Sequence, residues 1–524
     1  MIVDLNTLTE TPEFSCDLCV VGSGAAGLAI ASEVLHTPFK TLIVESGGME
    51  TEPPTQALYD VDLSGLPHPG STKGRFRICG GSTTQWGGQA LPLMSLDLEQ
   101  RDWIPYSGWP ISIDELRPYY TRASRFLRVD ERNFDSDLFA YLKAQPPAFN
   151  SERVRYHFSK WSPHPSVRER YLADLANRDN CTLLLHANVT SILLEKELNR
   201  VKRILVRSLG GQTALVHARI FVLCVGGIET ARLLLSNDQQ QTRGIGNEHD
   251  LVGRFFQDHP SATIGWLDGS DLAAAQQWLN VFHKNGLKYS VRCTAAPKWQ
   301  RENRTLNVSM GTTVVADNSR LQDAKVFYDA LRRRRLDPTV GRKLLSAMLH
   351  PEELILAGWH FLVHGRSFIP PGARLQIGLT SEQEPNPASR VMLSDKTDAL
   401  GIRRSDVRWV LTERTNSTLR SYARMLREEF QRVGIGEIRL EKWVLDDSPQ
   451  WTEHVTDQYH HMGTTRMNDS PRLGVVNSCC QVHGIANLYI GSSAVFPTSG
   501  HSNPTLTIIA LCIRLADQLK QELT

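Results

Sequence analysis

Blocks of apolar and polar residues near the start of the chain predict a strand, a helix and a second strand. The apolar run Leu18–Val21 has the length and composition of a buried strand. The segment LAIASEVL, from Leu28, then has apolar residues at helical spacing, and the short run TLIVE ends at Glu45. Near the other end, Leu506–Leu519 is a longer apolar run with helical spacing. The pattern therefore predicts a β–α–β unit at the start of the chain and a helix at its end.

Three glycines lie between the first strand and the helix, in the order GxGxxG. Gly22 permits a tight turn, Gly24 lets a pyrophosphate approach the backbone, and Gly27 lets the helix pack closely on the strand. The N-terminus of the helix offers free N–H groups and a partial positive charge to phosphates. Glu45 is placed to accept hydrogen bonds from ribose hydroxyls. The unit predicts a site for a dinucleotide, and by itself it leaves both FAD and NAD open.

A long irregular region rich in glycine and hydroxyl groups follows, at Gly70–Leu93. It contains the run GGSTTQWGG, in which backbone N–H groups can crowd against a ligand. We expect Trp86 to be buried, which argues against a simple surface loop. A nicotinamide enzyme would instead continue with regular βα repeats.

Composition, charge and cysteine spacing argue against several classes of protein and of binding site. The 524 residues predict two or more domains, and the 41% hydrophobic and 22% charged residues are ordinary for a globular protein. The net charge of +2 gives no reason to expect nucleic acid as a partner. No apolar stretch is long enough to span a membrane, and the N-terminus has no secretory pattern. We therefore expect a cytoplasmic protein, with export together with a partner subunit left open. No Cys or His set has zinc spacing, so we predict no structural metal.

Seven segments along the chain carry a family resemblance. In order, they are VVGSGAAGL, GGSTTQWGG, ARIFVLCVGGIETARLLL, GRFFQDHP, SEQEPNPASRVMLS, YHHMGTTRM and NLYIGSSAVFPTSGHSNPTLTI. Together they resemble the glucose–methanol–choline (GMC) family of FAD-dependent oxidoreductases, in its branch that oxidises sugars, polyols and glycosides. The resemblance covers nearly the whole chain.

The resemblance implies an α/β fold with two parts. A Rossmann-type FAD-binding domain would be assembled from discontinuous segments, residues 1–255 and 456–524, with a flavin-loop insertion at about 60–150. A substrate-binding domain with a mixed β-sheet and flanking helices would span 256–455.

The resemblance also implies a catalytic pair at the flavin. The family has a His in an HxxGT motif, which here is His460, and a His or Asn before the terminal helix, which here is Asn503. His460 would be the general base, since imidazole titrates near working pH, and FAD would accept a hydride at N5. Asn503 would hold the substrate oxygen through its amide. Because Gln85 stands where some relatives attach FAD through a His, we predict non-covalent FAD.

Other residues receive supporting roles. We expect His461 to face away from His460, His501 to contact flavin or support the pair, and His259 to bond locally. We expect His461, His501 and Gln85 to contact the substrate or to support the residues that do. The predicted cofactor contacts are Gly22, Gly24, Ala25, Ala26, Gly27, Glu45, Gly81, Ser82, Thr83, Trp86, Gly87, Gly88, Val189, Gly226, Gly491, Ser492, Asn503, Pro504 and Thr505.

The implied activity is oxidation of an alcohol group on a sugar, glycoside or polyol to a carbonyl. The alternatives are oxidation of a sterol-like or choline-like alcohol, a flavin-containing lyase, a non-catalytic flavoprotein and a nicotinamide dehydrogenase. The electron acceptor would be oxygen, a quinone, or a separate cytochrome or small subunit. The region 320–370 is expected to be partly helical, as a lid, a docking surface or a structural element.

Overall fold

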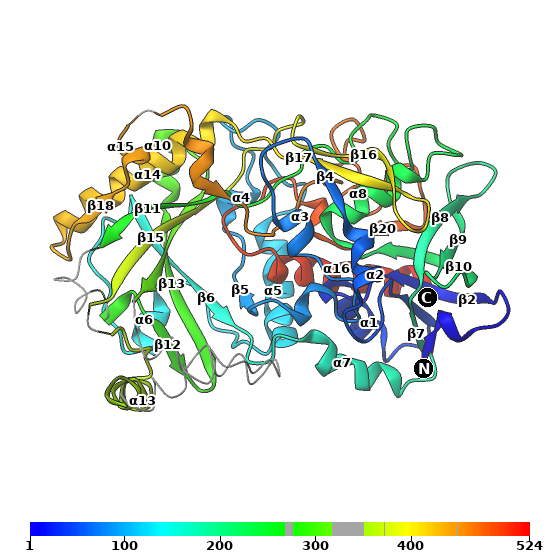
Figure 1. The fold of residues 1–524 in the computed structure, drawn as a ribbon, viewed down its shortest axis with the longest axis horizontal. Helices are drawn as coiled ribbons and strands as arrows, with labels where there is room; N and C mark the ends of the chain where they lie inside the picture. The colour runs from blue at the N-terminus through cyan, green and yellow to red at the C-terminus, as the bar shows by residue number, and fades with distance from the viewer. Residues whose placement is uncertain (268–274, 276, 317–350, 371, 447) are drawn as a thin grey trace.

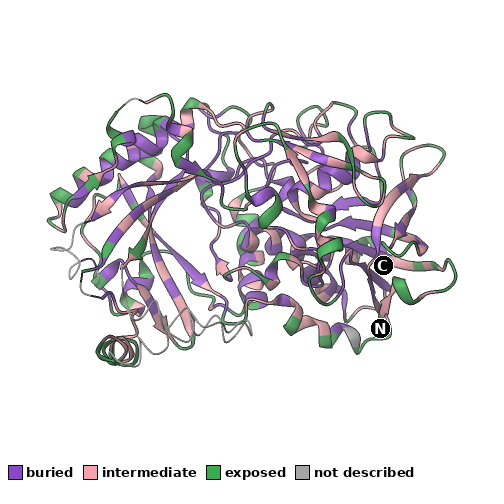
Figure 2. Ribbon diagram, viewed as in Figure 1, coloured by how far each residue is buried: buried purple, intermediate pink, exposed green. Residues whose placement is uncertain are grey.

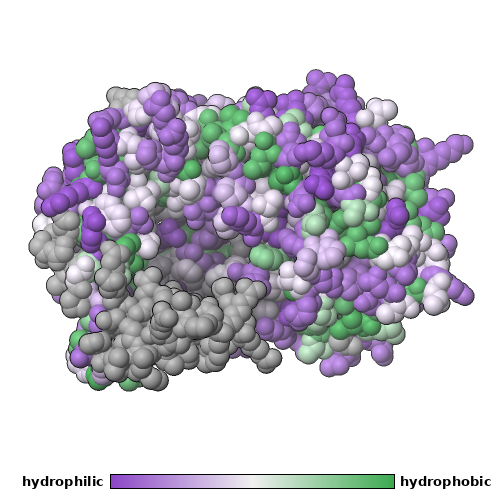
Figure 3. Space-filling view, viewed as in Figure 1, coloured by the Kyte–Doolittle hydropathy of each residue, from purple (hydrophilic) through white to green (hydrophobic). Residues whose placement is uncertain are grey.

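The chain folds into two halves, each built on its own large β-sheet (Figure 1). The computed structural model describes residues 1–267, 275, 277–316, 351–370, 372–446 and 448–524. Figure 2 shows that buried residues concentrate along the strands of both sheets and on the helices that cover them. On the face drawn in Figure 3, hydrophilic residues predominate and the surface is hollowed near its middle.

The first sheet has eight strands and a parallel centre. Its order is β1-β7-β3-β2-β10-β9-β8, with β20 paired to β10. The strands from β1 to β10 in this order run parallel, as does β20, whereas β9 and β8 are antiparallel. The bounds are β1 Ile2–Asp4, β2 Glu13–Val21, β3 Thr41–Val44, β7 Cys181–Leu185, β8 Asn188–Leu194, β9 Val201–Arg207, β10 Thr213–Leu223 and β20 Leu488–Ile490.

The second sheet has nine strands and is antiparallel, in the order β18-β11-β15-β14-β13-β6-β5, with β12 and β19 at its sides. Its strands are β5 Gln89–Ala90, β6 Val154–Trp161, β11 Ser261–Leu267, β12 Val281–Lys284, β13 Leu287–Ala295, β14 Val308–Val315, β15 Arg374–Ser381, β18 Ile438–Leu440 and β19 Val455–Thr456. A three-stranded sheet, in the order β16-β17-β4, joins Arg390–Thr397, Arg403–Arg408 and Val61–Leu63.

The α/β fold class predicted from the sequence is confirmed. The division into domains at residues 255 and 456 stays a prediction, and the sheets cross it. Both β5 and β6 come from the stretch predicted for the FAD-binding domain, yet they pair in the second sheet. Conversely, β16 and β17 come from the predicted substrate domain, yet β17 pairs with β4 and β16 pairs with β17 in the same small sheet.

Helices from both ends of the chain pack together beside the first sheet. The helix α16 (Thr505–Leu523) lies against α1 (Ala25–Val34) and α5 (Ile113–Leu127). The apolar residues of α16 are buried at helical spacing, among them Leu506, Ile509 and Ile513. Burial of this stripe fixes the last helix beside the first one, so the polar residues that precede α16 come to the dinucleotide-binding unit.

A different pair of elements covers the second sheet. The helix α14 (Glu413–Arg432) follows Thr412 and buries Leu419, Tyr422 and Leu426. The Tyr422 hydroxyl donates to the Cys293 carbonyl of β13 at 3.0 Å. This helix therefore occupies one face of the sheet and leaves the other face toward the first half of the molecule.

The region 320–370 is only partly within the described residues, because 317–350 lie outside them. The helix α13 (Glu352–His364) confirms part of the helical prediction, and none of its residues is buried. Its exposed side chains include Trp359 and Leu362. Among the described residues, no helix is long and apolar enough to cross a membrane.

The glycines of the first turn give a stability test. A Cβ on Gly27 would lie 1.9 Å from the Gly22 carbonyl oxygen, whereas a Cβ on Gly24 would meet nothing within 4 Å. We therefore expect Gly27→Ala to lower the free energy of unfolding by about 2–3 kcal/mol. As the matched control, Gly24→Ala should cost about 1 kcal/mol or less. Denaturant unfolding of the cofactor-free protein measures both, and equal losses would contradict the packing role of Gly27.

Candidate active site

The structure brings the predicted catalytic pair together. His460 lies in the loop after β19, and Asn503 comes directly before Pro504 at the start of α16. The Nδ2 atom of Asn503 is 3.2 Å from the Nε2 atom of His460. Both residues are half-buried, so each keeps a surface that a ligand can contact.

The backbone around His460 is held between two distant segments. Gln257 and Met462 exchange two backbone hydrogen bonds, at 3.0 and 2.9 Å. On the other side, the N–H groups of Gly463, Thr465 and Met467 donate to the carbonyls of residues 493–495. Since backbone hydrogen bonds fix the chain on both sides, the position of the His460 side chain is set by the fold and not by a free loop.

His259 determines which nitrogen of His460 carries a proton. Its Nε2 atom is 3.3 Å from the Ser499 carbonyl, which only accepts, so this nitrogen is protonated. The Nδ1 atom of a neutral His259 then accepts from the Nδ1–H of His460, at 2.9 Å. His460 is left with a lone pair on Nε2, the atom beside Asn503. The expectation that His259 caps or hydrogen-bonds locally holds only for its backbone N–H, which donates to Asp258, because its ring contacts a residue 201 positions away.

The imidazole rings of His259 and His460 are both kept neutral. Burial, together with the neighbouring His259, lowers the pKa of His460 to about 3. Burial also lowers the pKa of His259, although the Asp258 carboxylate opposes this shift. An unperturbed imidazole titrates near neutral pH, as the sequence analysis expected for His460. The buried ring differs because its charged form would lose hydration.

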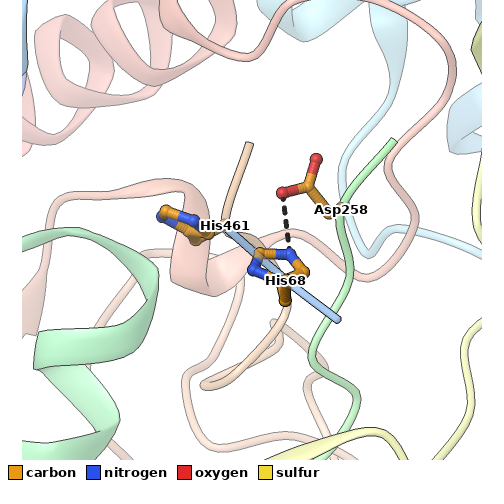
Figure 4. A group of neighbouring side chains, drawn as sticks. All are labelled: His68, Asp258 and His461. Atoms are coloured by element: carbon orange, nitrogen blue, oxygen red, sulfur yellow. Dashed lines mark ion pairs between the residues drawn. The ribbon is translucent and has the colours of Figure 1, made fainter. Parts of the chain in front are cut away.

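Asp258, which the sequence analysis did not single out, anchors both histidine segments. One carboxylate oxygen accepts the backbone N–H groups of His259 and Gln458, and the other accepts that of His460 at 2.9 Å. The Nε2 atom of His68 lies 3.2 Å from the second oxygen (Figure 4). Burial acts to raise the pKa of Asp258, but His68 and the histidines nearby outweigh it and hold that pKa below its usual range.

His461 lies beside this carboxylate and not beside the catalytic pair. Its ring centroid is 5.5 Å from that of His68 and 6.1 Å from that of Phe256. Potential metal-binding atoms of His68, Asp258 and His461 lie within 4.8 Å of one another (Figure 4). Since three backbone N–H groups and the His68 ring already surround the two Asp258 oxygens, we interpret the group as a polar cluster built on that carboxylate, and the absence of a metal stays a prediction.

His501 is buried behind the pair. Its ring lies 5.5 Å from the ring of His157 in an edge-to-face arrangement, and neither ring nitrogen has a hydrogen-bond partner within the described residues. Burial and the neighbouring His157 hold the pKa of His501 well below its usual value. His501 is therefore a neutral ring that packs against the second sheet through His157, and its role toward the flavin or the pair stays a prediction.

A cavity of about 600 Å³ opens where the first turn, the glycine-rich loop and the His460 segment meet. The GxGxxG turn and the N-terminus of α1 form one wall of it. The predicted site residues that line it are Gly22, Gly24, Ala25, Ala26, Glu45, Gly81, Ser82, Thr83, Gln85, Trp86, Gly87, Val189, Gly226, His460, His461, Ser492, Pro504 and Thr505.

Some predicted contacts lie behind this wall. Gly27 packs α1 on the Gly22 carbonyl, and a Cβ on Gly491 would lie 3.1 Å from the Cys224 sulfur. Gly88 likewise faces protein, with the Ser162 carbonyl 3.2 Å from its Cβ position. These glycines bring elements close together and do not line the cavity. Trp86 is half-buried and not buried as expected, and its indole donates to the Pro165 carbonyl at 2.8 Å.

A charged group in the same cavity was not among the residues predicted from the sequence. Arg75 and Arg77 lie over the Tyr59 ring, each 4.2 Å from its centroid. Arg77 also pairs with Glu229 at 2.7 Å. Burial acts to raise the pKa of Glu229, but Arg77, Arg232 and Arg75 hold it at about 2. The signal in the sequence was the pair of arginines inside the glycine-rich region, in GRFR.

The sequence of this chain matches family models and is similar to several known proteins. Two GMC oxidoreductase family models match residues 160–261 and 385–512. The large subunit of a fructose dehydrogenase from Gluconobacter japonicus is 23% identical, over 97% of this chain and 98% of its own. A paromamine 6'-oxidase from Streptomyces fradiae is also 23% identical, over 97% and 92%.

The chain belongs to the GMC oxidoreductases. It is therefore an oxidoreductase of a family that binds FAD and acts on CH–OH donors. Solved GMC structures agree with the fold. A formate oxidase superposes with a TM-score of 0.59 at 15% identity, covering 98% of this chain and 99% of its own. A pyridoxine 4-oxidase from Mesorbium loti gives 0.56 at 16% identity, covering 97% and 99%.

The cavity fits the FAD of a GMC oxidoreductase. Gly24 leaves its Cβ position open, and no side chain caps the N-terminus of α1, so N–H groups there are free for a pyrophosphate. Glu45 lies at the end of β3, where its carboxylate accepts the backbone N–H groups of Ser23 and Gly47 at 2.9 Å. That network fixes the carboxylate at the cavity wall, at the position expected for a ribose.

Histidine protonation in this site can be measured directly. Because burial lowers the pKa of His460 to about 3, we expect it to be neutral from pH 5 to pH 8. Its proton should be on Nδ1 because His259 accepts there. The measurement is ¹⁵N NMR of the histidine-labelled protein, with His460→Gln to assign the signals. A His460 protonated on both nitrogens at pH 5, or on Nε2 alone at pH 7, would contradict this assignment.

Proposed function

We propose that this GMC oxidoreductase oxidises an alcohol group on a sugar, glycoside or polyol to a carbonyl, with FAD bound non-covalently. The observation that carries the proposal is the contact of His460 Nε2 with the Asn503 amide, next to the cavity that fits FAD. The substrate class is supported by the names of relatives at 22–23% identity, among them a fructose dehydrogenase large subunit and a 2-methyl-1,2-propanediol dehydrogenase from Mycolicibacterium austroafricanum.

His460 is the proposed general base. Its Nε2 lone pair points toward Asn503 and can take the hydroxyl proton of a bound alcohol. The resulting imidazolium would keep its Nδ1–H donated to His259. The Asp258 carboxylate is held nearby by the His460 backbone and raises the pKa of His460, so it would stabilise the positive ring.

Asn503 is the proposed positioning group for the substrate oxygen. In the structure its amide nitrogen Nδ2 donates to the lone pair of His460 Nε2, at 3.2 Å. One lone pair accepts one strong hydrogen bond, so the alcohol must replace this contact. The hydroxyl would then donate to His460 Nε2 while its oxygen accepts from Asn503 Nδ2. This arrangement fixes the alcohol by two hydrogen bonds before its proton is removed.

The chemistry that FAD would supply when bound is acceptance of the hydride of the carbinol carbon. The residues that would hold it are the GxGxxG turn, Glu45 and the wall of the cavity around Thr83. Gln85 lines the same cavity, and its amide is not a nucleophile, which supports non-covalent binding.

The electron acceptor would be oxygen, a quinone, or a separate cytochrome or small subunit. The relative from Gluconobacter is a large subunit by name, which supports a partner subunit. Stopped-flow reoxidation of the reduced protein by oxygen and by a soluble quinone measures which acceptor it prefers. Reoxidation by neither would favour a protein partner.

The base assignment predicts a specific kinetic loss. We expect His460→Gln to slow anaerobic reduction of the bound flavin by about 10²–10⁴, because a positioned base contributes that much. Stopped-flow absorbance with a panel of sugars, glycosides and polyols measures the rate.

The matched control is His217→Gln, the same change on β10, outside the cavity lining. Its flavin should be reduced at a rate within about twofold of that of the unmodified protein, because substitutions outside a site usually have small effects. If the flavin of His460→Gln were reduced at the rate of the unmodified protein, the assignment of His460 as the general base would be wrong. A flavin that no alcohol in the panel reduces, although the alcohol is consumed, would support the lyase alternative.

Non-covalent binding predicts complete release of the cofactor. Acid precipitation of the purified protein should leave all of its flavin in the supernatant, with FAD as the only flavin species by chromatography. Flavin that stays with the precipitated polypeptide, or fluorescence of the protein band in a denaturing gel, would contradict the proposal.

A further inference from the structure

Arg292 stands on the face of the second sheet that looks toward the catalytic pair. It lies on β13 directly opposite His157 of β6. Opposite residues of an antiparallel pair share one face of the sheet. The His157 ring packs edge-to-face on His501, two residues before Asn503. The face that carries Arg292 is therefore the face that meets the segment before α16.

Two glycines clear the space on this face beside Arg292. Gly311 of β14 is paired with Gly378 of β15. A Cβ on Gly311 would lie 2.9 Å from Nη1 of Arg292 and 3.5 Å from its Cζ, so the guanidinium extends over this glycine. The Cβ position of Gly378 has only backbone oxygens near it, at 3.8 and 4.0 Å. With no side chain at either position, the sheet leaves room beside the guanidinium for a ligand.

The guanidinium of Arg292 has no hydrogen bond or ion pair with any residue that the structure describes, although the residue is half-buried. Two buried arginines among the described residues show the usual compensation. Arg101 pairs with Glu382 at 2.6 Å, and Arg232 pairs with Asp398 at 2.5 Å. Withdrawing a cation from water without a partner is unfavourable, so the charge of Arg292 contributes nothing evident to folding.

We propose that Arg292 binds an anionic group, a carboxylate or a phosphate, on the alcohol that this enzyme oxidises. This inference rests on the proposed function and narrows it to acidic sugar derivatives, such as uronates, aldonates or sugar phosphates. A guanidinium presents parallel N–H groups that match two oxygens of either anion. The alcohol end of the same molecule would lie between His460 and Asn503, with the anion beside the guanidinium, over Gly378.

The electrostatics of the pair agree with this placement. Beside burial, the charge of Arg292 contributes to the low pKa of His157, His501 and His460. Its field therefore reaches the base in the empty site. An anion on Arg292 would cancel that field and make His460 a better proton acceptor only when the substrate is bound.

Three matched compounds test the inference with the FAD-loaded enzyme: glucose, glucuronate and glucose 6-phosphate. The rate of flavin reduction and the affinity are measured for unmodified protein, Arg292→Met and Arg292→Lys. Affinity comes from titration of the oxidised flavin absorbance, so it does not depend on turnover. We expect the preference for an anionic compound over glucose to fall about 10- to 100-fold in Arg292→Met. Arg292→Lys, which keeps the charge without the paired N–H groups, should recover part of it.

The two anions distinguish the chemical source, because the preferred one identifies a carboxylate or a phosphate site. Gly311→Ala is a second variant that leaves Arg292 in place but displaces its guanidinium, and it should lower the same preference. Equal affinity of Arg292→Met and unmodified protein for both anions would overturn the role of Arg292. Loss of all flavin reduction with every compound, while the anion affinity still depends on Arg292, would instead overturn the proposed function.

Discussion

The buried Asp258 carboxylate is the interaction on which the site depends. It accepts backbone N–H groups from His259, Gln458 and His460, and so it joins two stretches of chain about 200 residues apart. Without this carboxylate, three N–H groups would lose their acceptor inside the protein, at a cost of about 1–3 kcal/mol each. The same bonds hold His259 and His460 with their Nδ1 atoms 2.9 Å apart. Protonation of the base is thus set by main-chain geometry.

The end of the chain completes the site for a similar reason. The apolar stripe of α16 is buried beside α1, and residues 493–495 pair with the backbone that follows His460. The short segment between them, which includes Ser499 and Asn503, must pass over the catalytic ring. It supplies the carbonyl that orients His259 and the amide that meets His460. A polar turn before the last helix is therefore the part of the chain that closes the site.

Local signals made the first half of the fold predictable. The strand, the glycine turn, the helix and Glu45 are close in sequence, and each has its own mechanical reason. The family motifs also indicated His460 and Asn503. The bond between His259 and His460, the role of Asp258 and the cluster of Arg75 with Tyr59 could not be predicted in this way. They arise only when separate strands and loops meet, and no periodicity along the chain reports such contacts. For the same reason β5 and β6, which precede residue 255, were not assigned to the second sheet.

The central claim is that His460 and Asn503 face a substrate over bound FAD, with Nε2 of His460 as the proton acceptor. A crystal structure of the FAD-loaded protein with a slowly oxidised alcohol tests it most directly. We expect one substrate oxygen within hydrogen-bonding distance of both His460 Nε2 and Asn503 Nδ2, and His259 still bonded to His460 Nδ1. A substrate oxygen bonded to neither residue, or a His460 ring turned so that Nδ1 faces the substrate, would contradict it.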